Sequence, residues 1–143
     1  MIKKVLFICV HNSGRSQMAE TLLNNLGKGD FFAESAGFDP APINPLVIDV
    51  MQEWGYDLSD HQSKDVFTFF RQGRLFDYVI TVCDKSREAE CPIFPGIVKR
   101  LHWTFNDPAE VVGNDSEKLE QVRKIRDAIR QKVANFINES IKT

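Results

Sequence analysis

The 143-residue sequence is poor in cysteine and histidine, and neither residue type is arranged as a metal site. It has three cysteines (Cys9, Cys83 and Cys91) and three scattered histidines, with no CxxC pair. A small, odd number of cysteines argues against a structural disulfide framework, and the spacing argues against a zinc site. The cysteines are therefore either inert core residues or centres of redox or nucleophilic chemistry.

The sequence also lacks a long apolar run and an excess of charge of one sign. No apolar segment approaches the roughly 18 residues of a membrane span, and the one near the N-terminus is too short for a signal peptide. The net charge of −2 offers nothing to attract nucleic acid or an anionic membrane. We therefore expect a cytoplasmic protein without nucleic-acid or membrane partners, folded as one domain over residues 1–143 and acting as a monomer.

Apolar periodicity predicts strands that alternate with amphipathic helices. Short apolar runs rich in β-branched residues predict strands, and apolar residues repeated three and four positions apart predict helices. Such alternation is typical of an α/β fold with one parallel sheet, here four-stranded, and helices on both faces. The predicted strands cover residues 5–9, 31–36, 78–82 and 97–103, and the predicted helices cover 16–26, 44–54 and 116–137, with a shorter helix capped by Ser63.

Three residues suited to catalysis follow predicted strands. Cys9 ends the first strand, Cys83 follows the strand YVITV, and Asp107 lies just beyond the fourth. Parallel α/β sheets bind ligands beyond the carboxyl ends of their strands. We therefore expect these three side chains at the same edge of the sheet.

The segment CVHNSGRS, residues 9–16, joins the first strand to the first helix. Backbone N–H groups in such a turn, together with a helix N-terminus, attract an anion, and the Arg15 guanidinium matches two oxygens of a phosphate-like ion. The same field favours a Cys9 thiolate, to which Ser16 can donate a hydrogen bond. Asn12 can brace the loop or adopt a left-handed conformation there. The predicted oxyanion-binding residues are Val10, His11, Asn12, Ser13, Gly14, Arg15 and Ser16.

An inert buried thiol and a solvated arginine are the alternative interpretation of this loop. The cysteine–five residues–arginine–serine spacing on a strand–loop–helix favours catalysis over that alternative. No lysine follows the glycine, so the loop is not a Walker nucleotide site. We therefore expect no cofactor and no metal.

The spacing of Cys9, Arg15 and Ser16, with Asp107-Pro108 far downstream, resembles the low-molecular-weight protein tyrosine phosphatase fold. Within that fold, several further segments resemble the thioredoxin-coupled arsenate reductases. These segments are SQMAE (16–20), ESAG (34–37), the stretch 44–63 and VKRLHWTFNDPA (98–109).

The resemblance implies a role for each reactive residue. Cys9 would attack bound arsenate, for which phosphate and sulfate are mimics, and Asp107 would be the general acid. Cys83 would then form a disulfide with Cys9, and Cys91 would attack Cys83. The resulting Cys83–Cys91 disulfide would be reduced by thioredoxin, which completes a thiol–disulfide relay. A phosphatase acting on phosphotyrosine or phosphomonoesters, which needs only Cys9, Arg15 and Asp107, remains the alternative.

Three departures from the family pattern accompany the resemblance. Seven residues separate Cys83 from Cys91, where six are usual, and Gly14 stands where the fold often has a cysteine. Some of these reductases hold a monovalent cation through Asn, Glu, Ser and Asp side chains. Asn12, Glu20 and Ser35 match that pattern, but Lys64 stands in place of the Asp, and we expect its ammonium to replace the ion.

Overall fold

The computed structural model describes residues 1–83 and 92–141. Four parallel strands form one sheet in the order β2-β1-β3-β4. The strands are β1 (Lys3–Cys9), β2 (Phe31–Gly37), β3 (Tyr78–Thr81) and β4 (Lys99–His102), and the helices are α1 (Arg15–Leu26), α2 (Pro45–Gln52), α3 (Val66–Arg71) and α4 (Asp115–Ile141), with a short 3₁₀ helix η2 at Pro108–Glu110. The predicted α/β class with a four-stranded parallel sheet is confirmed.

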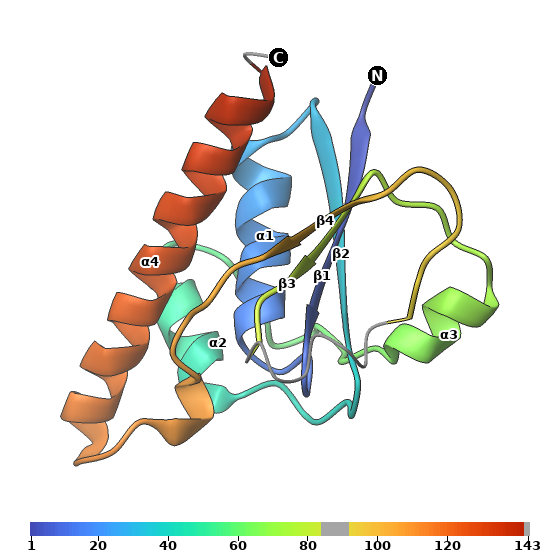
Figure 1. The fold of residues 1–143 in the computed structure, drawn as a ribbon. Coiled ribbons are helices and arrows are strands. Elements are labelled where there is room, and N and C mark those ends of the chain that lie inside the picture. The colour runs from blue at the N-terminus through green and yellow to red at the C-terminus, as the bar shows by residue number, and fades with distance from the viewer. Residues whose placement is uncertain (84–91, 142–143) are drawn as a thin grey trace.

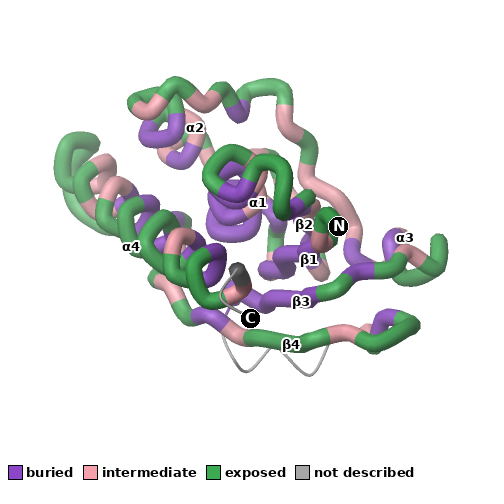
Figure 2. Tube along the Cα trace, turned by 90° about the horizontal axis from the view of Figure 1, so that it is seen from above, coloured by how far each residue is buried: buried purple, intermediate pink, exposed green. Residues whose placement is uncertain are grey.

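Helices cover both faces of the sheet, as Figure 1 shows. On one face α1, α2 and α4 pack against the side chains of Val5, Phe7 and Cys9. On the other face α3 packs against Leu6 and Ile8. All five residues of β1 from Val5 onward are buried, which matches the purple centre of Figure 2 and explains why the strand is apolar at every position.

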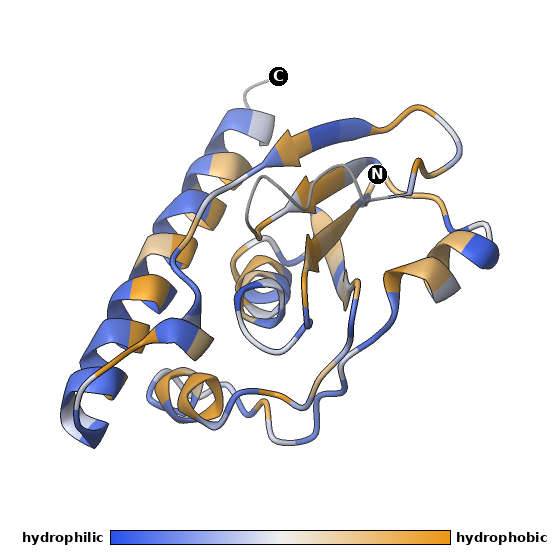
Figure 3. Ribbon diagram, turned by 60° about the horizontal axis from the view of Figure 1, so that its bottom comes forward, coloured by the Kyte–Doolittle hydropathy of each residue, from blue (hydrophilic) through white to orange (hydrophobic). Residues whose placement is uncertain are grey.

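The helix ends follow local sequence signals. Asn44 caps α2, its side-chain oxygen accepting from the backbone N–H of Leu46 at 2.9 Å, and Pro45 occupies the first turn as expected. The predicted cap of α3 is wrong, because Asp65 accepts from the N–H of Phe67 while Ser63 donates elsewhere. In Figure 3 hydrophobic and hydrophilic residues alternate along α4, whose buried side is formed by Val122, Ile125, Ile129, Val133 and Phe136.

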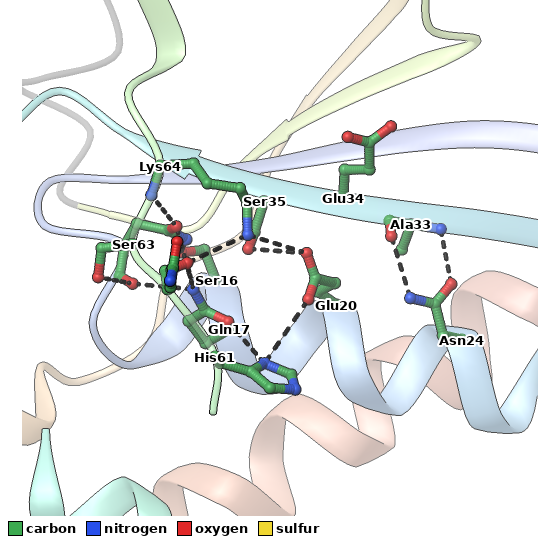
Figure 4. Close-up of polar contacts among 12 residues, drawn as sticks. Ser16, Gln17, Glu20, Asn24, Ala33, Glu34, Ser35, His61, Ser63 and Lys64 are labelled. Atoms are coloured by element: carbon green, nitrogen blue, oxygen red, sulfur yellow. Dashed lines mark hydrogen bonds and ion pairs between the residues drawn. The ribbon is translucent and has the colours of Figure 1, made fainter. Parts of the chain in front are cut away.

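The outer edge of β2 is covered by side-chain and loop contacts. The Asn24 side chain of α1 donates to the carbonyl oxygen of Ala33 (3.0 Å) and accepts from its N–H (2.7 Å), as Figure 4 shows. Phe31 N–H donates to the carbonyl of Gly27, and Gly37 N–H donates to that of Lys64. Four of the backbone groups along this edge strand are therefore paired within the chain.

Candidate active site

Loop 9–16 begins at the carboxyl end of β1. β2 lies on one side of β1 and β3 on the other, so the chain changes direction across the sheet at this strand, where parallel α/β sheets bind ligands. The segment 38–44, which continues from β2, runs beside this loop and binds its carbonyl oxygens. Backbone N–H groups of residues 38, 39, 41 and 44 donate to the carbonyls of residues 9, 10, 11 and 13, respectively. Because these carbonyls are engaged by the segment, the opposite side of the loop is left to present N–H groups to an anion.

Asn12 holds the turn of the loop. Its φ of 51° is the only positive φ of a non-glycine residue in the described part of the chain. Its side-chain oxygen accepts from the N–H of Lys64 (2.9 Å) and from the side-chain amide of Gln17 (3.1 Å). The left-handed conformation that the sequence suggested for Asn12 is thus confirmed and is fixed by contacts on both sides.

The hydroxyl group of Ser16 lies 2.8 Å from Cys9 Sγ, and both atoms are buried. Asn12 Nδ2 donates to Ser16 Oγ at 2.7 Å, and this orientation of the amide is set by the two donors to its oxygen. Since Ser16 Oγ accepts from Asn12, its own hydrogen is free to point at sulfur. The N–H of Asn12 also donates to Cys9 Sγ at 3.2 Å. Two donors directed at one sulfur stabilise a thiolate.

Gln17 and His61 form a support for Asn12 that sequence reasoning missed. Gln17 is fully buried, and its amide nitrogen donates to Asn12 and to the carbonyl of Gln62. Its oxygen lies 3.1 Å from His61 Nδ1, which must therefore be the donor. Figure 4 shows this chain of contacts from His61 through Gln17 toward Ser16. No local sequence signal marks this support, because the Gln17–His61 contact joins residues 44 positions apart.

Arg15 and Asp107 meet beside Cys9. The buried guanidinium of Arg15 lies 3.4 Å from Asp107 Oδ2 and donates to the carbonyl of Phe105 at 3.2 Å. Asp107 also begins η2, its other oxygen accepting from the N–H of Ala109 at 2.9 Å. The structure therefore brings the predicted nucleophile, arginine and acid together, in a pocket lined by Cys9, His11, Ser13, Gly14, Arg15, Asn44, Asp107 and Pro108.

The Lys64 ammonium lies 3.7 Å from Glu20 Oε1, which also accepts from the Ser35 hydroxyl at 3.0 Å. His61 approaches the second oxygen of Glu20 at 4.0 Å. Lys64 reaches Asn12 through its backbone N–H rather than through its ammonium. The positive charge of Lys64 therefore lies beside Glu20. Glu20 in turn lies near His61, which contacts Gln17 below the loop (Figure 4).

Cys83 follows β3 and is buried in the same core cluster as Cys9. Strand β3 pairs Thr81 with Ile8, and the N–H of Val82 donates to the carbonyl of Ile8. Cys83 therefore follows β3 at the same edge of the sheet at which Cys9 ends β1. Cys91 lies outside the described residues. Among those residues, no helix is both long and apolar enough to cross a membrane.

The comparisons with known proteins agree with this geometry. The family model described as low molecular weight phosphotyrosine protein phosphatase matches residues 4–143. The chain belongs to this family. An arsenate reductase of Halalkalibacterium halodurans is 36% identical over 137 residues, which are 95% of this chain and 96% of that protein.

Solved structures of arsenate reductases share the fold at similar identity. A structure described as an arsenate reductase in the phosphate binding state has a TM-score of 0.73 at 31% identity, covering 96% of this chain and 98% of its own. The thioredoxin-dependent arsenate reductase of Corynebacterium glutamicum has a TM-score of 0.68 at 36% identity, covering 97% of this chain and 63% of its own. The family resemblance inferred from the motifs is confirmed.

Proposed function

We propose that this chain is an arsenate reductase, in which Cys9 attacks arsenate held by loop 9–16 and phosphate and sulfate bind as mimics. The observation that carries the proposal is a second buried thiol, Cys83, which follows the neighbouring strand β3 and belongs to the same core cluster as Cys9. Phosphate ester hydrolysis has no use for a second thiol at this place. Relatives named as arsenate reductases along nearly the whole chain support the same assignment.

In the first step the Cys9 thiolate attacks arsenic and one oxygen leaves as hydroxide, which takes the proton of Asp107. Arg15 and the loop N–H groups hold the remaining oxygens, and the Ser16 hydroxyl donates a hydrogen bond to the attacking sulfur. Arsenic keeps its oxidation state of +5 in this step. The product is a Cys9–arsenate adduct.

In the second step the Cys83 thiolate attacks the sulfur of Cys9. The sulfur–arsenic bond breaks, its electron pair passes to arsenic, and arsenite leaves while a Cys9–Cys83 disulfide forms. Cys91 then attacks the sulfur of Cys83, which releases the Cys9 thiolate and leaves a Cys83–Cys91 disulfide. Two electrons from thioredoxin reduce that disulfide and restore the starting thiols.

The decisive measurement is arsenate-dependent NADPH consumption with thioredoxin and thioredoxin reductase, run beside a glutaredoxin system. We expect multiple turnovers with thioredoxin for the unmodified chain and none for Cys83→Ser, although Cys9 in that variant still reacts once with arsenate. Full multi-turnover reduction by Cys83→Ser would reject the relay. Consumption with the glutaredoxin system alone would reject thioredoxin as the donor.

Phosphomonoester hydrolysis is the second candidate, because Cys9, Arg15 and Asp107 would suffice for it. Arsenate and phosphate share shape and charge, so weak phosphatase activity accompanies the proposed reaction. Among the described residues, the lining of the pocket contains no Phe, Tyr or Trp side chain to hold a phenyl ring, and Tyr78 is buried against Phe136. If Cys83→Ser and Cys91→Ser left all activity of the chain unchanged, the phosphatase would be its function.

A thiol relay works only where its cysteines are kept reduced, and this supports a cytoplasmic location. Cys9, Arg15 and Asp107 meet in one pocket within a single chain, so we propose that a monomer is sufficient for turnover.

A further inference from the structure

His11 is the third residue of loop 9–16 and lines the same pocket as Cys9, Arg15 and Asp107. Its Nδ1 lies 2.8 Å from the carbonyl oxygen of Asp39, on the segment that runs beside the loop. A carbonyl oxygen only accepts, so Nδ1 carries a hydrogen in both the neutral and the charged ring. The tautomer is fixed by this contact, and Nε2 is the nitrogen left to gain or lose a proton.

The charged and titratable groups around His11 come from four elements. The Asp39 carboxylate lies 3.8 Å from Nδ1 and is largely exposed. Arg15 of α1 is permanently positive and is paired with Asp107 at the start of η2, while Cys9 ends β1. Arg15 is positive at every pH of interest, whereas the ionised forms of Asp107 and Cys9 are negative. His11 is the member of this set that can add positive charge to the pocket.

We propose that His11 is a binding residue of the oxyanion site, and that its imidazolium form selects for a doubly charged oxyanion. The inference deepens the proposed function, since it concerns the same loop. Imidazole side chains take up their proton between about pH 8 and 5, so the added charge is present on the acidic side of that range. His11 is about half exposed, and water and salt therefore limit the gain in affinity to about three- to tenfold.

The same charge distinguishes substrate from product. Arsenate carries one to two negative charges near neutral pH, whereas arsenite is uncharged there. An imidazolium at the pocket therefore attracts the oxyanion that enters and does not retain the product that leaves. His11 thus raises affinity for the substrate without slowing product release.

Sulfate binding to a Cys9→Ser protein tests this role directly. Sulfate keeps two charges throughout pH 5.5–8.5, and the substitution removes the titration of the thiol. Calorimetry at constant ionic strength compares this protein with the Cys9→Ser/His11→Gln double variant at both pH values. Asp107 is present in both proteins, so the difference between them isolates His11.

We expect the ratio of sulfate affinities at pH 5.5 and 8.5 to be about three- to tenfold larger when His11 is present. Equal ratios in two proteins with the same unfolding temperature would overturn the inference. A His11→Asn variant, which shortens the side chain differently, must give the same reduced ratio as His11→Gln. Absence of sulfate binding by both proteins at pH 5.5 would overturn the oxyanion site itself. Sulfate binding with the expected ratios but no arsenate reduction by the unmodified chain would reject the proposed reductase and leave the role of His11 supported.

Discussion

The α-carbon of Gly37 lies so close to the catalytic loop that a β-carbon on it would stand 2.7 Å from the carbonyl oxygen of Val10. The same β-carbon would stand 2.8 Å from the backbone nitrogen of Asn12. Both neighbours are backbone atoms, which cannot rotate away. Glycine at the end of β2 therefore allows loop 9–16 to pack against the sheet.

Gly37→Ala should displace the loop and lower kcat/KM for arsenate by about 10- to 100-fold, because small errors in the position of the nucleophile are costly. Steady-state kinetics and the unfolding temperature measure the two effects separately. Gly14→Ala is the matched comparison, since its β-carbon would meet only the Pro108 and Val47 side chains, at 3.3 and 3.5 Å. A larger kinetic loss in Gly14→Ala than in Gly37→Ala would contradict this account.

Ser16→Ala removes the hydroxyl group that points at Cys9 Sγ. A hydrogen bond to a charged group contributes about 1.5 kcal/mol or more, so the thiolate population at neutral pH should fall. We expect the rate of Cys9 alkylation by iodoacetamide at pH 7 to drop about 3- to 10-fold, measured in a Cys83→Ser/Cys91→Ser background. Ser13→Ala, in the same loop, serves as control and should alkylate at the parental rate. Equal rates for the Ser16 and Ser13 variants would show that the hydroxyl does not matter.

Lys64→Asp exchanges the ammonium beside Glu20 for a second carboxylate. Two adjacent carboxylates repel unless a cation lies between them, so this variant should require an added monovalent ion. We expect its unfolding temperature and arsenate turnover to be higher in potassium chloride than in choline chloride, while the unmodified chain responds equally to both salts. A potassium requirement in the unmodified chain would refute the view that Lys64 supplies the charge.

Glu53 joins the end of α2 to α4 through Arg123 and Arg126. Hydrogen bonds from Arg123 and then Arg126 hold the pKa of Glu53 below its ordinary value of 4.5. A carboxylate with a lowered folded-state pKa contributes stability that is present above about pH 4.5 and is lost as the pH falls through the folded-state pKa.

Glu53→Gln should therefore lower the unfolding temperature at pH 7 by about 1 to 3 °C, a small value because the side chain is about one-third exposed. The difference should shrink toward zero near pH 3, as thermal melts across pH will reveal. Glu120→Gln, which removes the more exposed partner of Arg123, should have a smaller effect. A constant difference at all pH values would exclude the charge as its cause.

Local patterns were sufficient to predict the fold and the centre of the site. The buried strand that ends at Cys9, the apolar stripe of α1 and the Cys9–Arg15 spacing are each contained within a few residues. Strand and helix ends were less predictable, since α2 ends at Gln52 and β4 covers only Lys99–His102. The ends of such elements depend on tertiary contacts that a local pattern does not contain.

The support of the site was not predictable for the same reason. Gln17 contacts His61, which lies 44 residues away in the sequence. Lys64 binds Asn12 through its backbone N–H, a group that every residue except proline has and that the sequence therefore does not mark. Ser63 looked like a helix cap because serine favours that position, but its hydroxyl donates to the carbonyls of Asn12 and Ala41. Long-range partners of this kind are fixed only when the chain is folded.

The pairing of Asn24 with Ala33 bears on how the protein behaves at high concentration. The Asn24 amide imitates a neighbouring strand and occupies the donor and acceptor that a second molecule would need for pairing with β2. The opposite edge, β4, carries exposed Lys99 and Arg100 instead, which repel the same edge of another copy. Hydrogen bonds from Asn24 thus block pairing at one edge of the sheet, and charge repulsion opposes it at the other. Because salt screens that repulsion, the protein should resist ordered self-association best at low salt.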